Sequence, residues 1–473
     1  MNKKKLLFAY IAFDILAALI SWVCLYVYRK VVGESMSFSA IGSAMMADPT
    51  FFWGLVLAPT FWVFLHAFFG YYNKVYRKSR LNELKTTLGV TLFGILVFFF
   101  LFILDDIVTS PRDYVKYMLC YFTLQFLLTY IPRVCITTHI NHGIHSGQIG
   151  FNTIIVGSDE KALQVYNSLQ QQKPAPGNFL IGYVKVEETS EDLLTDHLAN
   201  LGTIAQLPDI VDHNHIEELI VTLHNGQRKH IDNLIVLARD HGNISLRIAP
   251  QQQDVLLGTV KTSSVMYEPL IDITPEYLPT WQRLLKRGFD IVFSLIALIL
   301  LLPLYIFLAI GVKRSSPGPI FYRQERIGYH GKPFQIIKFR SMRDNAEESG
   351  PMLSSKSDDR ITPFGKFMRQ YRLDETPQFY NVLIGDMSLV GPRPERQYYI
   401  DQITERVPYY PLLLGIKPGI TSWGQVKFGY AENVDEMIER LRWDILYIEN
   451  MSIEMDIKIL IYTVMIVLKK EGK

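Results

Sequence analysis

Residues 360–396 read RITPFGKFMRQYRLDETPQFYNVLIGDMSLVGPRPER and combine an adjacent carboxylate pair, Asp374-Glu375, with a set of basic residues. The basic residues around the pair are Arg360, Arg369, Arg372, Arg393 and Arg396. Guanidinium groups bind phosphate oxygens through forked hydrogen bonds, while carboxylates hold divalent cations or attack phosphorus. The stretch therefore predicts a site that holds a metal ion and a polyphosphate together.

The acid pair also has a purely structural interpretation. Leu373 and Pro377 favour a helix start at this point, where carboxylates satisfy free amides and the helix dipole. A helix N-terminus also favours phosphate, so the two interpretations are compatible. The residues alone leave both open.

Length and charge set broad bounds on the protein. The chain has 473 residues, enough for about three domains, and a formal net charge of +2. This near-neutral balance gives no signature of a nucleic-acid-binding protein. The cysteines, Cys24, Cys120 and Cys135, lie in or beside apolar runs without metal-ligand spacing. We therefore expect packing residues rather than a metal site or a disulfide framework.

Four apolar runs occupy the first 131 residues, at about 6–28, 51–70, 86–104 and 113–131. Each is close to the ~20 residues that a helix needs to cross a bilayer, and the first is too long for a signal peptide. The basic residues that flank the runs are Lys3, Lys4, Lys5, Lys74, Arg77, Lys78, Arg80 and Arg133. The positive-inside rule then places both ends of the bundle on the cytoplasmic face, and snorkelling accommodates the exceptions Arg29 and Lys30.

Residues 140–260 have the composition of a soluble α/β module. Strands are predicted at 152–156, 180–184, 217–222 and 244–248, with helices at 160–169 and 228–240. This alternation favours a parallel, Rossmann-like sheet. The first turn reads GSDEKA rather than GxGxxG, and Asp159 and Glu160 place negative charge where a pyrophosphate would bind. We therefore expect a structural or regulatory module rather than a dinucleotide-binding one.

A connector at 261–285 contains Pro269, Pro275 and Pro279 and ends in a short amphipathic helix at Trp281 that suits a membrane interface. A fifth apolar run follows, and it is long enough to span. Pro303 bends this run, and basic residues flank both of its ends. We expect a re-entrant helix at 288–312 that enters and leaves on the cytoplasmic side. The alternative is a fifth span with a proline kink.

The remainder of the chain is basic and rich in turns. FQIIKFRSM, at 334–342, predicts a strand or interfacial element that directs Lys338 and Arg340 to one face, because they are two residues apart. Residues 344–359 form a polar, acidic loop. KPGITSWGQV, at 417–426, predicts a turn ending at an aromatic residue that either stacks on a base or simply packs. The tail, 434–470, predicts a helix pair on the membrane surface.

Five motifs, in this order, are similar to those of the bacterial sugar transferases, the monotopic phosphoglycosyl transferases. They are KRGFDIVFSLIALILLLPL (286–304), KFRSM (338–342), RLDETPQFYNVLIGDMSLVGPRPE (372–395), KPGITSWGQV (417–426) and WDILYIENMSIEMDIKIL (443–460). The four N-terminal helices and the α/β module resemble the long-form members. Those are polyprenyl-phosphate hexose-1-phosphate transferases, which start exopolysaccharide, capsule or lipopolysaccharide O-antigen units.

The residue patterns and the resemblance together predict an integral membrane protein of the α plus α/β class. It would comprise a four-helix transmembrane bundle (1–135), a cytoplasmic Rossmann-like module (140–260), and a mainly helical catalytic domain (286–473) with the re-entrant helix. The resemblance implies a location in the bacterial inner membrane, with the catalytic domain on the cytoplasmic face.

The resemblance implies transfer of a hexose 1-phosphate from a UDP-hexose to polyprenyl (undecaprenyl) phosphate, with release of UMP. Asp374 would be the nucleophile that forms an aspartyl phosphosugar, and Asp374 and Glu375 would hold Mg²⁺. The implied substrate-binding residues are Lys338, Arg340, Arg369, Arg393 and Asp444. The partners are UDP-glucose or UDP-galactose, the carrier lipid and the bilayer, and the α/β module is a candidate homodimer contact. No nucleic acid is expected.

The chain departs from the family pattern at two positions. Leu302 stands where many members have Ser before the membrane proline, and Thr376 replaces the usual Leu after the acid pair. Two other functions remain open from the residues. A membrane-bound nucleotide-sugar dehydratase or epimerase would need an intact Gly-rich turn and a Tyr-x-x-x-Lys pair. A scaffold that recruits polysaccharide machinery would need only the first 280 residues.

Overall fold

The computed structural model of the chain describes residues 3–73, 76, 78–103, 111–172, 177–187, 192–224, 227, 230–241, 244–250, 270–273, 278–343, 352, 358–429 and 431–468. Two compact units are present. The first is Met1–Phe151 with Tyr166–Phe179, and the second is Asn152–Val165 with Leu180–Lys473. Most of the predicted connector, with Pro269 and Pro275, and most of the acidic segment 344–359 lie outside the described residues.

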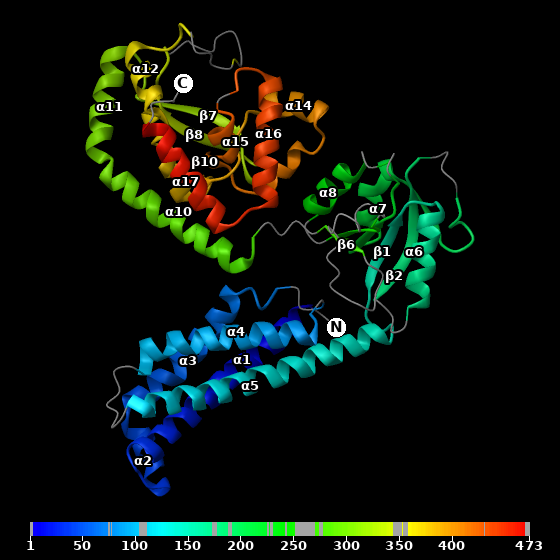
Figure 1. The fold of residues 1–473 in the computed structure, drawn as a ribbon, viewed down its shortest axis with the longest axis vertical. Helices are drawn as coiled ribbons and strands as arrows, with labels where there is room; N and C mark the ends of the chain where they lie inside the picture. Colours follow the sequence, from blue (N-terminus) through cyan, green and yellow to red (C-terminus); the bar gives the residue numbers. More distant parts are fainter. Residues whose placement is uncertain are drawn as a thin grey trace. The chain divides into compact units, whose positions relative to one another are not determined.

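Four long helices form the N-terminal bundle: α1 (Lys3–Tyr28), α3 (Pro49–Phe68), α4 (Arg80–Phe98) and α5 (Pro111–His145). All four are long and apolar enough to cross a membrane, which confirms the four predicted spans. Capping fixes two of the starts, because Asp48 accepts a hydrogen bond from the Thr50 amide and Ser79 from the Asn82 amide. Helix α5 continues well beyond its predicted end to His145 (Figure 1).

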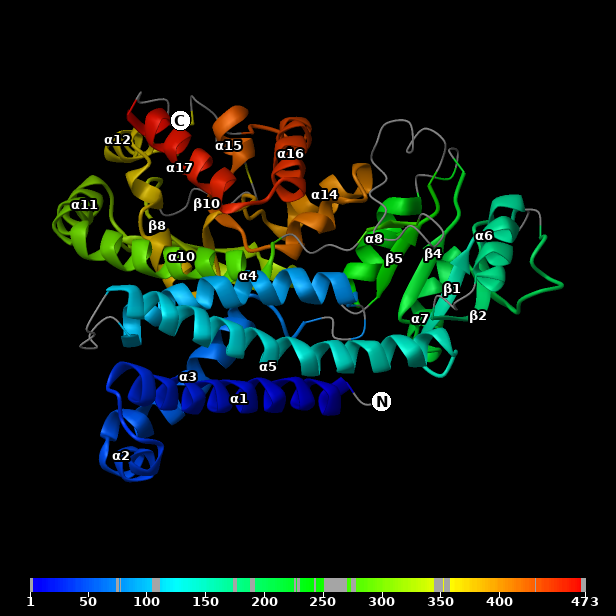
Figure 2. The same cartoon turned by 60° about the horizontal axis from the view of Figure 1, so that its bottom comes forward.

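The α/β module is built on a six-stranded sheet in the order β3-β2-β1-β4-β5-β6. Its strands are β1 (Phe151–Val156), β2 (Asn178–Lys185), β3 (Asn200–Thr203), β4 (Glu218–Val221), β5 (Ser245–Ile248) and β6 (Ile271–Asp272). Helices α6 (Glu160–Gln171), α7 (Leu207–His213) and α8 (Ile231–Asp240) accompany them (Figure 2). Pairing is parallel for β1–β4, β2–β3 and β4–β5, as predicted, and antiparallel for the edge strand β6.

The C-terminal domain begins with a bent helix pair, α10 (Thr280–Leu300) and α11 (Leu302–Ser315), that meets at 61° (Figure 1). The bend therefore occurs where Pro303 predicted it, although Leu302 replaces the usual Ser. The separate interfacial helix expected at Trp281 is wrong, because α10 runs without interruption from Thr280. Its first turns and its apolar part form one rigid element.

The rest of the domain is a small mixed fold. An antiparallel hairpin of β7 (Phe321–Ile327) and β8 (Pro333–Phe339) includes the strand predicted in FQIIKFRSM. A parallel pair joins β9 (Ser388–Val390) to β10 (Gly419–Thr421). The helices are α12 (Pro363–Gln370), α13 (Gln378–Ile384), α14 (Gln397–Arg406), α15 (Trp423–Lys427), α16 (Val434–Glu449) and α17 (Ile453–Leu468).

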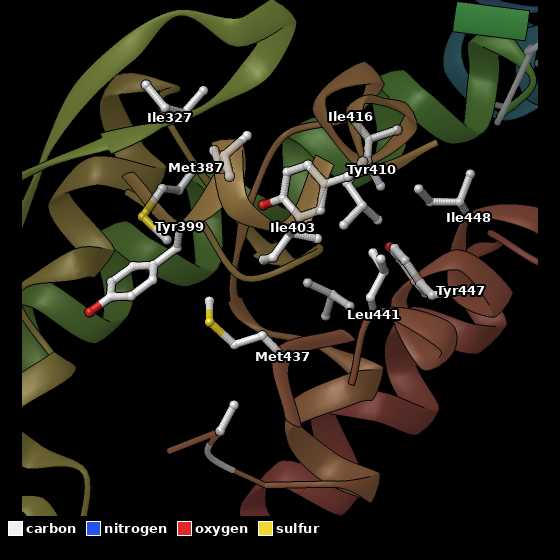
Figure 3. Packing of buried hydrophobic residues seen from close by; sticks show 14 of the residues in the cluster. Ile327, Met387, Tyr399, Ile403, Tyr410, Ile416, Met437, Leu441, Tyr447 and Ile448 are labelled. Atoms are coloured by element: carbon white, nitrogen blue, oxygen red, sulfur yellow. The ribbon is translucent and has the colours of Figure 1, made fainter. Parts of the chain in front are cut away.

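A large hydrophobic core joins most of this domain, and a smaller one lies around Leu308 and Phe339. Side chains of β7, α14, α16 and the segment around Tyr410 converge in the large core (Figure 3). Tyr447 and Ile448 are fully or almost fully buried here, so the prediction that both tail helices lie on a surface is wrong for α16. Helix α17 does keep an exposed apolar face, formed by Ile457, Ile461, Tyr462, Val464 and Met465.

Candidate functional site

The acid pair lies in a single 3-10 turn, Leu373–Glu375, between α12 and α13. Arg372 precedes the turn in the left-handed conformation (φ 55°), which is uncommon for a residue other than glycine. Thr376, which replaces the usual Leu, donates its hydroxyl to the Leu373 carbonyl at 2.7 Å and closes the turn. Both carboxylates are buried, with 7% of Asp374 and 6% of Glu375 exposed. The predicted helix start is therefore present, and it holds two carboxylates out of water.

Glu375 is neutralised by cations from two other segments. Its Oε1 accepts from Lys338 Nζ at 2.7 Å and from Arg393 Nη2 at 3.1 Å. Burial opposes ionisation of Glu375, but the charges of Lys338 and Arg393 prevail and hold its pKa well below the usual value. Glu375 is thus a fixed carboxylate at the centre of the site.

Asp374 has the opposite environment. Within the described part of the chain, no side chain donates a hydrogen bond to its carboxylate. Burial, and then the adjacent charge of Glu375, raises the pKa of Asp374 to about 6, against the opposing charges of Lys338 and Arg369. Two adjacent carboxyl groups are therefore separated in pKa by their surroundings, as is typical of acids with different chemical roles.

The basic residues predicted from sequence divide into two groups. Lys338 and Arg393 contact Glu375, and Arg369 is close enough to lower the pKa of Asp374. Arg369 is oriented by a hydrogen bond from Nε to Ser341 Oγ at 2.9 Å. Arg340 is different, since its guanidinium donates to the carbonyls of Ser316 and Pro317 at 2.7 and 2.6 Å. Lys338 and Arg340 therefore have different hydrogen-bond partners, and substrate binding by Arg340 stays a prediction.

Asp444 lies elsewhere in the domain, on α16. Its Oδ1 accepts from the Gly424 amide at 3.0 Å, at the start of α15. Burial raises the pKa of Asp444 to about 6, opposed by the charge of Arg440 and by hydrogen bonds from Gly424 and Ser422. These contacts are with the α15 turn rather than with Asp374 or Glu375. Trp423 on the same turn lies against Trp443, with ring centroids 5.9 Å apart, so that turn is packed.

The position of Arg393 depends on two glycines. Gly391 precedes it directly after β9, and a Cβ there would lie 2.3 Å from the Lys417 carbonyl oxygen. Gly419 packs from the other side, where a Cβ would meet the Gly391 amide. Only glycine allows the two backbones to approach this closely. The GPRP and KPG motifs therefore pack closely against each other, and this contact positions Arg393.

Sequence reasoning missed two residues that complete the site. Glu395 is 5% exposed and forms ion pairs with Arg326 at 3.1 Å and with Arg440 at 2.5 Å. The Arg326 guanidinium is in turn close enough to Lys338 and Arg393 for their positive charges to repel each other. Tyr305 of α11 donates its hydroxyl to the Thr376 carbonyl at 3.0 Å, beside the acid turn. Glu395 had a signal in the PRPE motif, whereas Tyr305 was hidden in an apolar run.

The expected magnesium ion can be tested against these residues. The described residues contain no group of three or more His, Cys, Asp and Glu side chains that could hold a metal. Mg²⁺ is commonly bound by only one or two carboxylates together with substrate phosphates. Asp374, with no side-chain hydrogen bond from the described residues, and the adjacent Glu375 provide such a pair. The two residues therefore fit an ion that the substrate helps to bind.

These features define a protein with membrane-type helices and a buried carboxylate pair among cationic side chains, an arrangement suited to binding phosphate. A family model described as bacterial sugar transferase matches residues 281–470, and one described as CoA-binding domain matches residues 67–250. The UDP-glucose:undecaprenyl-phosphate glucose-1-phosphate transferase of Xanthomonas campestris pv. campestris is 32% identical, over 71% of this chain and 70% of that protein. The chain belongs to the bacterial sugar transferase family.

Two further relatives match different shares of the chain. The undecaprenyl-phosphate galactose phosphotransferase of Salmonella typhimurium is 30% identical, over 89% of this chain and 87% of that protein. The UDP-N-acetylgalactosamine-undecaprenyl-phosphate N-acetylgalactosaminephosphotransferase of Aeromonas hydrophila is 38% identical, over 47% of this chain and 52% of that protein. The Aeromonas match thus spans about half the length of that relative, while the Salmonella match spans most of both chains.

The residues of the α/β module do not fit coenzyme A at the usual position in such sheets, the switch point between β1 and β4. Asp159 takes the place of a phosphate at the start of α6, where its Oδ1 accepts from the Ala162 amide at 3.0 Å. Its Oδ2 pairs with His224 Nε2 at 2.7 Å. The Leu193 amide also donates to the Ser158 carbonyl. This chain's own groups therefore occupy the position where a phosphate would bind.

Proposed function

We propose that the protein transfers a hexose 1-phosphate from a UDP-hexose, with glucose or galactose as the sugar, to polyprenyl phosphate, and that it releases UMP. The observation that carries this proposal is the asymmetric acid pair. Glu375 is neutralised by Lys338 and Arg393, while the Asp374 carboxylate, whose pKa is raised, receives no side-chain hydrogen bond from the described residues. The names of the Xanthomonas and Salmonella relatives support the donor and the acceptor.

The reaction would proceed in two displacements. In the first, an Asp374 carboxylate oxygen forms a bond to the sugar-bearing phosphorus as the bond from that phosphorus to the UMP oxygen breaks. In the second, an oxygen of polyprenyl phosphate attacks the same phosphorus, and the Asp374 carboxylate leaves. Each step breaks one phosphorus–oxygen bond and forms another, so no oxidant or reductant is required. The enzyme would thus react with its two substrates in turn.

The electrostatics of the pocket suit this chemistry. A carboxylate and a phosphate about 4 Å apart repel by roughly 4 kcal/mol at an intermediate dielectric, so cations must oppose this repulsion. Lys338, Arg369 and Arg393 supply the positive charge. A Mg²⁺ ion at Asp374 and Glu375 would neutralise further phosphate charge. With a pKa of about 6, Asp374 is mostly ionised at pH 7 yet is more basic than an ordinary aspartate.

The anchoring of the domain suits a lipid acceptor. Helix α10 binds the domain through Lys286, which contacts the Val390 carbonyl and Asp456, and through Asp290, which accepts from the Leu389 amide. Helix α11 contacts the same domain at two points. Tyr305 on the helix donates to the Thr376 carbonyl, and Arg340 of the domain donates to the Ser316 carbonyl at the end of the helix. The large apolar residues exposed on the pair are Leu284, Leu285, Phe289, Ile291, Val292, Phe293, Leu295, Ile296, Ile299, Leu300, Leu302, Ile306, Phe307 and Ile310.

A fifth span would put the two ends of this pair on opposite sides of the membrane. Because both limbs bind one small domain, we infer that the pair is re-entrant, as the sequence predicted, and dips into the membrane from one side. Basic residues at both ends of a re-entrant pair support the cytoplasmic side, where UDP-sugars and Mg²⁺ are found. The acid pair would then lie near the headgroup level, within reach of a lipid phosphate.

The test uses the full chain in lipid nanodiscs with polyprenyl phosphate and a panel of UDP-hexoses. We expect release of UMP rather than UDP, and Asp374→Asn should reduce it by at least about 10³-fold. Omission of the lipid should leave a sugar-phosphate adduct on the peptide that contains Asp374, detected by mass. Release of UDP, or turnover that needs both substrates bound together without an adduct, would exclude this mechanism. Asp401→Asn, at an exposed carboxylate, is the matched control.

A further inference from the structure

The interior of the membrane bundle contains a polar stripe that the proposed reaction does not use. Helix α4 carries Glu83, Thr87 and Thr91, four residues apart, and α5 carries Gln125, Thr129, Arg133 and Thr137 at the same spacing. All seven are at most 2% exposed. A spacing of four places each set on one helix face. Buried polar residues within membrane helices are costly, so a continuous set of them indicates a function.

In the part of the stripe around Arg133 and Glu83, the charged groups pair with one another. Arg133 donates to both carboxylate oxygens of Asp14, and its guanidinium lies 3.5 Å from the centre of the Tyr71 ring. Glu83 pairs with Lys78 and accepts from the Tyr71 hydroxyl. The two carboxylates are thus balanced by two cations. Among the described residues of this network, positive and negative charges are therefore equal in number.

Contacts between the helices fix their relative levels in the bundle. Trp62 of α3 donates to the Tyr121 hydroxyl of α5 at 2.8 Å, and a Cβ on Gly94 of α4 would meet the Trp62 ring. Helices α1 and α5 are antiparallel, because Tyr10 bonds Thr137 and Asp14 bonds Arg133. An aromatic layer therefore crosses the bundle at Trp62, Tyr121 and Gly94.

Each helix contributes one polar residue about one turn from that layer, on the side of the Arg133–Asp14 ion pair. His66 is four residues after Trp62, Gln125 is four after Tyr121, and Thr91 is three before Gly94. Ser21 is seven residues, about two turns, after Asp14 and so reaches the same level. All four have 0% exposure. We call Ser21, His66, Thr91 and Gln125 the polar layer.

The polar layer has hydrogen-bonding groups that the described residues leave unpartnered. They are Ser21 Oγ, both ring nitrogens of His66, Thr91 Oγ1 and Gln125 Oε1. Buried groups of this kind almost always bind a partner, and the set combines donors with acceptors but has no formal charge. Its ligand should therefore be small, neutral and able both to donate and to accept. Water is the ligand that meets these conditions.

We propose that the bundle binds ordered water in the polar layer, and that through this water His66 exchanges its proton with the end of the bundle at Lys78. Polar side chains connect His66 to Lys78 in that direction. The ring of His66 lies 5.5 Å from that of Tyr71, whose hydroxyl contacts Glu83 and Thr87. In the other direction the Trp62–Tyr121 layer closes the path. The charged groups that face His66 along it are Lys78, Glu83, Arg133 and Asp14.

The proposal can be tested on the full chain in nanodiscs with ¹⁵N-labelled histidine, by solid-state NMR transfer of polarisation from water. The chain has 11 histidines, and His66→Gln assigns the relevant signal by its loss. We expect the His66 ring to receive water polarisation within a factor of about three of the exposed His224 ring. Exchange of its ring proton with solvent should also be measurable. A His66 ring that receives no water polarisation would overturn the proposal.

A matched pair of variants separates water binding from general loosening of the bundle. Thr91→Val removes a hydroxyl of the polar layer and should slow transfer to His66 at least about twofold. Thr123→Val makes the same chemical change on the exposed face of α5 and should leave the transfer unchanged. Equal effects of the two variants would count against the site. Both should retain transferase activity, because neither residue belongs to the catalytic domain.

Discussion

Replacement of the proposed nucleophile should stabilise the protein while it removes activity. Burial and the charge of Glu375 raise the pKa of Asp374 from 3.8 to about 6. A carboxyl with a raised pKa in the folded state contributes stability below its unfolded pKa and loses that contribution as the pH rises through the folded value. The ionised Asp374 therefore lowers the stability of its turn by about 3 kcal/mol at pH 7.5 and by about 1.5 kcal/mol at pH 5.

Asparagine resembles the protonated acid in size and charge, so Asp374→Asn should recover most of this free energy. The assay is hydrogen exchange of peptides across residues 365–390 in the full chain, in nanodiscs without Mg²⁺ or nucleotide. We expect the local opening free energy to rise more at pH 7.5 than at pH 5. A lower opening free energy, or a change that is independent of pH, would refute the assigned environment of Asp374. Asp401→Asn should show neither effect.

Four other outcomes follow from the same contacts. Glu375→Gln leaves Lys338 and Arg393 without their shared carboxylate, so UMP release should fall at least about 10²-fold and the domain should lose about 3 kcal/mol. Arg340→Gln should lower the thermal midpoint strongly, whereas Arg369→Gln should mainly impair UDP-hexose use; the reverse pattern would mean that Arg340 binds phosphate. Coenzyme A should not shift the thermal midpoint, and a saturable shift would show that the Asp159 site is open. Single cysteines at Thr280 and Ser316, in a background without the native three, should be labelled from the same side of the membrane; labelling from opposite sides would show a fifth span.

The sequence predicted what depends on local pattern. Hydropathy located all four membrane helices, and the proline located the bend between α10 and α11. The acid pair and its basic neighbours were identified because they are close in sequence. The partners of Arg340, the carbonyls of Ser316 and Pro317, could not be predicted because they follow a helix whose return path only the tertiary structure fixes. The edge strands β3 and β6 have only four and two residues, too few for a periodic signal.

The short motif KFRSM links the membrane anchor to the acid pair. Lys338 binds Glu375, Arg340 binds the backbone at the end of α11, and Ser341 orients Arg369. Tyr305 provides a second link from α11 to the acid turn, at the Thr376 carbonyl. A shift of α11 would therefore change the position of the acid turn and of its cations together. Because the acceptor phosphate is carried by a lipid, the proposed chemistry requires a fixed distance from the membrane helix to Asp374. The KFRSM segment and the Tyr305 hydroxyl hold this distance.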